Sequence, residues 1–207
     1  TVVIPHGCRP SKPLPKKEAR RRLGLPEGVP IVGYLGFISP YKGLETLIEA
    51  VRGLDGVALL IGGGYHVEPG TPYITRLKEW SLKVLQGRCQ WLGYVPDELV
   101  PAFYGAVDLI VYPSRYMTES GALLMALSHG MPVIARDLPP VREKHREGVL
   151  EVFVDVSDLR EKITALLGDP KRRGRLGERA FRWASERNWS RVAEMHLSLY
   201  REVLDGG

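Results

Sequence analysis

The sequence predicts an α/β fold, with a parallel sheet of about six strands, helices on both faces and C-terminal helices that close the domain. Two observations carry this prediction. Short apolar runs alternate with amphipathic segments between residues 30 and 167, which is typical of βαβ units with parallel strands. Residues 170–207 carry helix signals only, so the sheet ends before them.

The first half of the pattern runs from residue 16 to residue 92. Residues 16–25 have helical spacing with Arg and Lys on one side, and Gly24 and Pro26 end that helix. The apolar run 30–35 predicts a strand. The next helix has apolar residues at one face, at positions 44, 47, 48, 51 and 54. The remaining elements of this half are a strand at 57–61, a helix at 74–85 and a short strand at 89–92.

The second half starts at Asp97, which we expect to cap a helix that runs to Ala106. Ser157 or Asp158 is expected to cap a later helix that ends at Leu167. Further elements are strands at 109–112, 132–135 and 149–154 and a helix at 121–129. We therefore divide the chain into a Pro- and Lys-rich linker or hinge (1–15), a Rossmann-like domain (16–169) and closing helices (170–207).

Composition excludes several classes of protein. The chain has 207 residues, of which 44% are hydrophobic and 26% charged, so it can bury a core and is not disordered. The longest apolar run, 107–112, is interrupted by Asp108 and is too short to span a bilayer. Two distant cysteines, Cys8 and Cys89, cannot build a disulfide framework, and we expect a reducing, cytoplasmic setting. The scarcity of Asn and Gln favours a thermophilic source.

Basic residues concentrate in the segment 9–22, which holds seven Arg or Lys and one Glu, whereas the whole chain carries a net charge of +5. Such a run can contact nucleic acid or an anionic membrane. It contains no aromatic residue on which bases could stack, so we expect no nucleic-acid partner. We favour a solvated helix face, and peripheral membrane contact stays open as an alternative.

Loops that follow the strands are the expected ligand site, because ligands of open α/β sheets bind beyond the carboxyl ends of the strands. After the first strand, Gly36 lets the backbone approach a ligand and Lys42 stands at a helix entrance, which suits a phosphate. An ordinary strand–helix turn with a lysine on the surface would have the same sequence pattern. Gly62, Gly63 and Gly64 follow the second strand and allow a ligand or a neighbouring loop to come close, without forming a dinucleotide fingerprint.

The loop 113–121 follows the fourth strand and opens another helix. Ser120 and Gly121 stand at the helix start, where a capping role alone would explain them. Arg115 and Glu119 in the same loop offer a phosphate partner and a hydroxyl acceptor. The pairing favours a binding function. The histidines lack metal-ligand spacing, and we expect no metal.

Taken in chain order, these loops resemble the C-terminal domain of a family 4 glycosyltransferase, one half of the two-domain GT-B fold. Val3-Ile4-Pro5-His6-Gly7 resembles the interdomain hinge motif, and 36–43 resembles the donor-phosphate loop. Gly93-Tyr94-Val95 and the Gly-x-Pro-Val-x-Ala run at 130–135 match two further motifs. The segment 191–201 resembles the final helix, which in that family crosses back onto the N-terminal domain.

Two departures from the family pattern stand out. Phe37 occupies the place where the phosphate loop usually has arginine. The family has two glutamates eight residues apart at the donor helix. When the sequence is aligned back from Gly130, Met117 and Met125 occupy these two positions. When the alignment starts from Glu119 instead, the second position holds a leucine. A subset of the family has Tyr-Lys-Gly and Ser-Gly at these two places, and this chain resembles that subset.

The resemblance implies a retaining, metal-independent transferase that uses a nucleotide-diphosphate sugar as donor substrate and no further cofactor. Lys42 and Glu119 are the implied catalytic residues, Glu119 acting on the hydroxyls of the donor sugar. The implied phosphate ligands are Gly36, Lys42, Arg115, Ser120 and Gly121. The base is implied to meet Gly93, Tyr94 and Val95, while the ribose has no assigned partner.

The resemblance also implies a partner domain. An N-terminal acceptor domain is expected and missing from these residues, and the acceptor would be a glycan or a lipid. We expect a cytoplasmic location, with the inner membrane surface as an alternative, and a chain that binds nucleotide but alone transfers nothing. The rival hypotheses are a non-catalytic nucleotide or sugar-phosphate binding module, and an interaction protein that works through the basic segment 9–22.

Overall fold

The computed structural model describes residues 2–64 and 72–205, and it contains a six-stranded parallel sheet with strand order β3-β2-β1-β4-β5-β6. The strands are β1 (Ile31–Leu35), β2 (Ala58–Gly62), β3 (Cys89–Gly93), β4 (Leu109–Tyr112), β5 (Val133–Arg136) and β6 (Glu151–Phe153). The α/β prediction is therefore confirmed, and each predicted strand lies within two residues of its observed bounds.

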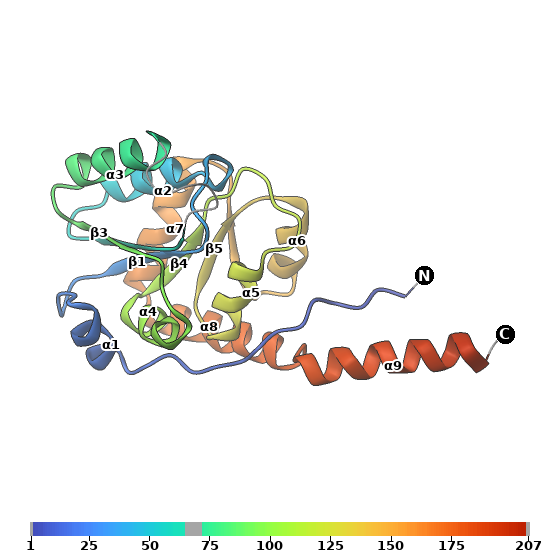
Figure 1. Ribbon diagram of the computed structural model, residues 1–207. Helices are drawn as coiled ribbons and strands as arrows, with labels where there is room; N and C mark the ends of the chain where they lie inside the picture. The colour runs from blue at the N-terminus through green and yellow to red at the C-terminus, as the bar shows by residue number, and fades with distance from the viewer. Residues whose placement is uncertain (1, 65–71, 206–207) are drawn as a thin grey trace.

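Helices cover both faces of the sheet. Figure 1 shows α2 and α3 above the sheet and α1, α4 and α8 beneath it, while α9 projects away from the body of the domain beside the N-terminal segment. Helix α7 packs against α2, and α5 packs against α8. The helices are α1 (Lys16–Leu23), α2 (Leu44–Arg52), α3 (Pro72–Val84), α4 (Val100–Ala106), α5 (Gly121–Ser128), α6 (Pro139–Arg146), α7 (Val156–Gly168), α8 (Pro170–Ser185) and α9 (Trp189–Asp205). Two short 3₁₀ helices, η1 (Pro40–Lys42) and η2 (Asp97–Leu99), complete the set.

The core lies at the two central strands. Every residue of β1 and β4 is buried, because a parallel sheet covered on both faces buries its strands completely. From β1 the chain continues to β2 on one side, and β4 lies on the other side. The topological switch point, where ligands of such sheets bind, is therefore between β1 and β4.

Two helix starts differ from the sequence prediction. Asp97 makes no side-chain capping bond; it opens η2, and α4 begins only at Val100. The cap of α7 is Asp155 rather than Ser157 or Asp158. Its carboxylate accepts the Asp158 N–H at 2.9 Å, while the Asp158 carboxylate accepts the Val154 N–H at 2.9 Å. This reciprocal arrangement resembles a capping box and fixes the helix start two or three residues earlier than predicted.

Helix α6 was not predicted. It begins with two consecutive prolines at its first positions, a place where proline is tolerated, and its buried residues are Val141 and Lys144. Because Val141 is the one buried apolar residue of this helix, the sequence shows no helical repeat of apolar residues here, and the segment was not predicted as a helix. The helix matters because Lys144 reaches the candidate site described below.

The basic segment is only partly a solvated face, which corrects the favoured prediction. Arg20 is 4% exposed and donates to the Ala106 carbonyl at 2.9 Å and to the Asp108 carboxylate at 3.0 Å. Asp108 also accepts the Ile31 N–H at 2.8 Å and the Lys16 ammonium at 2.6 Å. The Arg20–Asp108 ion pair therefore connects α1 to the starts of β1 and β4. Arg21 on the same helix is exposed.

Replacing Arg20 with Met is expected to lower the free energy of unfolding by about 2 kcal/mol, because Ala106 loses a buried donor and Asp108 loses its buried cation. The cost stays moderate since Lys16 still pairs with Asp108. Urea denaturation of the variant measures it, with Arg21→Met as the matched control on the exposed side. Equal midpoints for the two variants would contradict the structural role of Arg20.

Within residues 2–64 and 72–205, no helix combines the length and apolar character needed to cross a membrane.

Candidate functional site

A cleft of about 480 Å³ opens at the carboxyl ends of β1, β2 and β3, beside the start of α5. It lies at the switch point identified from the strand order. Seven of the predicted site residues line it: Gly36, Lys42, Tyr94, Val95, Glu119, Ser120 and Gly121. They come from three separate loops, so the fold brings together residues that are far apart in the sequence. Gly93 and Arg115 do not line the cleft.

The floor of the cleft consists of strand extensions whose backbones approach very closely. The Gly36 N–H donates to the Gly62 carbonyl at 3.0 Å, and the Gly63 N–H donates to the Gly93 carbonyl at 2.7 Å. Gly63 has φ +152°, and a Cβ atom there would lie 1.8 Å from the Gly36 carbonyl oxygen. The glycine run therefore serves to admit the neighbouring loop. Gly93 lies beneath the cleft, where its carbonyl accepts the Gly63 N–H.

Two buried tyrosines fix the strand ends under the cleft. The Tyr34 hydroxyl donates to the Phe37 carbonyl at 2.8 Å, and the Tyr112 hydroxyl donates to the Ala122 carbonyl at 2.6 Å. Burial raises the pKa of both phenols, so they stay neutral donors. These bonds hold the loop after β1 and the first turn of α5 in fixed positions, which preorganises the cleft.

Lys42 is a half-buried cation without an acidic partner among the described residues. Its ammonium lies 4.8 Å from the centre of the Tyr41 ring, a cation–π contact. The turn that carries it is closed by Gly43 at φ +66°, where a Cβ would lie 2.6 Å from the Pro113 carbonyl oxygen. The cleft thus contains a positive charge that no acidic side chain within residues 2–64 and 72–205 neutralises.

The first turn of α5 supplies further positive character. Ser120 is its N-cap, and its hydroxyl accepts the Leu123 N–H at 3.3 Å. The N–H groups of Gly121 and Ala122 belong to the first turn and have no intrahelical acceptor. Apart from its chain neighbours and the backbone of its own helix, no described residue places an atom within 4 Å of where a Gly121 Cβ would stand, so the helix start is not crowded on that side. A helix start of this kind favours an anion.

Glu119 stands at the cleft just before this helix. One carboxylate oxygen accepts the Ser120 N–H at 3.2 Å, and the other accepts the Lys144 ammonium at 3.2 Å. Each oxygen keeps a lone pair for another donor, such as a ligand hydroxyl. The carboxylate is thus oriented from two sides.

Arg115 lies outside the cleft in this structure. Its guanidinium is 3.5 Å from the Glu45 carboxylate, and its backbone N–H donates to the Tyr41 carbonyl at 2.8 Å. The side chain is 59% exposed and packs beside the Gly43 turn. Arg115 therefore lies next to the turn that carries Lys42, but its guanidinium points to Glu45 and not into the cleft.

Sequence reasoning missed several residues of the cleft. Asp97 lines it, and its carboxylate has no hydrogen-bond or ion-pair partner among residues 2–64 and 72–205. Its position after the third strand was the available signal, but the residue was assigned to a helix cap. Phe37 and Met125 also line the cleft, and both are exposed apolar side chains next to it. Only the fold shows that they face the same space.

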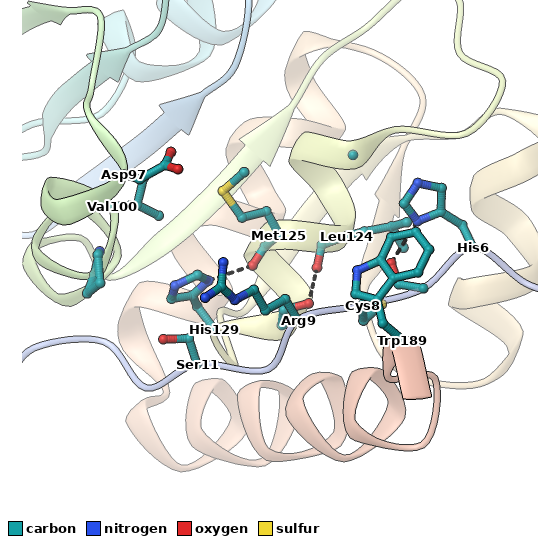
Figure 2. Close-up of a pocket in the computed structure, with 14 residues that line it drawn as sticks. His6, Cys8, Arg9, Ser11, Asp97, Val100, Leu124, Met125, His129 and Trp189 are labelled. Carbon is teal, nitrogen blue, oxygen red and sulfur yellow. Dashed lines mark hydrogen bonds between the residues drawn. The ribbon is translucent and has the colours of Figure 1, made fainter. Parts of the chain in front are cut away.

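A second cavity of about 430 Å³ adjoins the cleft and shares Asp97, Val100, Gly121 and Met125 with it. Figure 2 shows this cavity between the N-terminal segment, α5 and the start of α9, with Arg9 and Trp189 at its wall. The His129 Nδ1–H donates to the Met125 carbonyl at 2.8 Å, and burial lowers the pKa of its ring.

No group of three or more His, Cys, Asp or Glu side chains in the described part of the chain is arranged to hold a metal ion.

The fold and the cleft define the class of protein: a Rossmann-like α/β half-domain of the GT-B type, with a cleft at the switch point of the sheet. Residues 15–183 match the family model described as glycosyl transferases group 1, and the chain belongs to this family.

The sequence relatives agree with this membership, and solved structures share the fold. The chain is 32% identical over 205 residues to D-inositol 3-phosphate glycosyltransferase of Corynebacterium efficiens, covering 92% of this chain and 48% of the relative. It is similar to sucrose-phosphate synthase of Thermosynechococcus elongatus, with a TM-score of 0.84, 26% identity, and coverage of 99% of this chain and 53% of that one. HepE of Anabaena in complex with UDP has a TM-score of 0.82 at 21% identity, over 93% of this chain and 54% of that one. The chain thus spans about half the length of the curated relatives it matches.

Proposed function

We propose that this chain is the donor-binding half of a retaining family 4 glycosyltransferase and that its cleft holds a nucleotide-diphosphate sugar. One observation carries the proposal. The ammonium of Lys42, which has no acidic partner among the described residues, and the first turn of α5 line the same cleft, at the switch point of the sheet. A diphosphate would neutralise both. The solved HepE complexes with UDP and with UDP-glucose support the choice of ligand, since that chain shares this fold.

The cleft would catalyse transfer by stabilising the leaving group. When the glycosidic bond breaks, negative charge develops on the diphosphate, and donors that are already in place lower the barrier without reorganising. Lys42 supplies a point charge, and the amides of Gly121 and Ala122 supply directed N–H groups. Glu119 would accept hydrogen bonds from sugar hydroxyls, and the base would lie against Tyr94 and Val95 over the Gly93 turn. No step of this scheme requires a metal.

Arg115 joins this set in the proposal by exchanging Glu45 for the diphosphate. The Arg115–Glu45 contact is 3.5 Å long between side chains that are 59% and 35% exposed. Such a surface pair contributes little, about 0–1 kcal/mol, so a diphosphate next to the Lys42 turn can displace it. This exchange would restore the planar, bidentate phosphate partner that Phe37 does not provide.

The other half of the reaction lies outside this chain in our proposal. An N-terminal domain would bind the acceptor, a glycan or a lipid, and would close over the donor to exclude water. The protein would work in the cytoplasm or at the inner membrane surface. The half-length match to the curated relatives supports a second domain of similar size.

Isothermal titration calorimetry with UDP, GDP, ADP, CMP and inorganic phosphate at two salt concentrations tests the proposal. We expect saturable binding of one nucleoside diphosphate, at least about tenfold tighter than CMP, because the second phosphate meets Lys42 and the α5 amides. Equal affinity for all the nucleotides and for phosphate, falling steeply with salt, would overturn the donor site and indicate a nonspecific basic surface.

A further inference from the structure

Lys144 on α6 is a buried cation directly behind the candidate site. Its side chain is 7% exposed, whereas the Glu119 side chain that it pairs with is 45% exposed. The ammonium lies 3.2 Å from the Glu119 carboxylate and 3.4 Å from the Pro140 carbonyl, and 5.8 Å from the centre of the Trp183 ring. A lysine is rarely buried to this degree unless it is paired.

The pair contributes little net stability by itself. Taking an ammonium out of water costs several kcal/mol in a real protein, and a single partly exposed carboxylate repays only part of that cost. A Met side chain could fill the same space without the desolvation cost. Packing alone therefore does not explain why a charged lysine is buried at this position.

The reason lies in the charge of the cleft. Glu119 lines the same cleft as Lys42 and the first turn of α5, where the proposed ligand brings a diphosphate. A bare carboxylate there would repel that anion and compete with it for the helix start. The ammonium of Lys144 neutralises Glu119 from the buried side, so the carboxylate can still accept hydrogen bonds from the open side.

We propose that Lys144 is a positioning residue that orients Glu119 and cancels its charge, which allows a carboxylate to serve as the sugar-hydroxyl acceptor beside a diphosphate. This inference rests on the proposed function, since it needs an anionic ligand in the cleft. It adds a residue from a helix that the sequence did not predict.

The test compares the wild-type chain with Lys144→Met, Glu119→Gln, the double variant of both, and Lys171→Met as a control. Lys171 is an exposed lysine on α8 without an ion-pair partner among the described residues, so its loss changes net charge alone. Each protein is melted without ligand and then titrated with UDP, GDP and ADP by calorimetry.

Without ligand, Glu119→Gln should lower the Tm by a few degrees, because it leaves a buried ammonium without its carboxylate. Lys144→Met should not lower the Tm, since Glu119 is exposed enough for water to solvate it. On titration, Lys144→Met should bind the preferred nucleoside diphosphate about tenfold more weakly, as expected for one uncompensated like charge. The double variant should regain affinity to within about threefold of wild type, and Lys171→Met should match wild type.

Two results would overturn the inference while leaving the donor site intact: Lys144→Met binds as tightly as wild type, or the double variant binds no better than Lys144→Met. The second result would mean that Lys144 acts on packing and not on charge. If the wild-type chain binds none of the three nucleoside diphosphates, the proposed function fails, and the role of Lys144 fails with it.

Discussion

Replacing Lys42 with Ala should weaken binding of the preferred nucleoside diphosphate by about thirtyfold. Lys42 is the cleft cation that lacks an acidic partner in the described part of the chain, so no internal ion pair has to break before it meets the ligand. A charge-assisted hydrogen bond to phosphate contributes about 1.5–3 kcal/mol, which corresponds to about ten- to a hundredfold in affinity. Calorimetry of the variant measures the loss directly.

The matched control is Lys17→Ala, which removes an exposed lysine of α1 that has no ion-pair partner within residues 2–64 and 72–205. It should bind as wild type does. Both variants should keep the wild-type Tm, because the cation–π contact with Tyr41 is the one side-chain interaction that Lys42 makes with the described residues. An unchanged affinity of Lys42→Ala would remove Lys42 from the phosphate site and with it the observation on which the proposed function depends.

Gly63→Ala should have the largest effect on stability, a loss of at least about 3 kcal/mol. The new methyl group would lie 1.8 Å from the Gly36 carbonyl oxygen, a backbone atom that cannot rotate away as a side chain does. The positive φ of +152° adds conformational strain for any residue with a Cβ. Relief requires the two loops to separate, which would break the bonds from Gly63 to Gly93 and from Gly36 to Gly62.

Urea denaturation measures this loss, and Gly64→Ala is the control in the same loop, since the nearest atom to its Cβ position is a Tyr94 side-chain carbon at 3.5 Å. We expect the control to cost less than about 1 kcal/mol. Because Gly36 lines the cleft, Gly63→Ala should also weaken nucleotide binding in the surviving folded protein. A midpoint for Gly63→Ala equal to that of Gly64→Ala would show that the two loops do not depend on this close approach.

The alternation of short apolar runs and amphipathic helices determined the architecture. All six strands of the described residues were predicted. The two central strands, β1 and β4, are buried on both faces, and such strands have continuous apolar runs that can be recognised without their partners. The position of the cleft also followed from the sequence, because the carboxyl ends of parallel strands meet at one edge. Helix α6 was missed, since its start is two prolines and its core contribution is chiefly one valine.

The tertiary structure alone decided which side chains meet. Whether Gly63 faces a ligand or Gly36 depends on the register of β1 with β2, which no local pattern states. Arg115 and Glu119 stand in one short loop, yet Arg115 turns to Glu45 while Glu119 receives Lys144 from another helix. Arg20 and Lys17 share one helix, yet only Arg20 is buried on Asp108. Periodicity follows from local geometry and can be read along the chain, whereas the partner of a charge depends on distances across the fold.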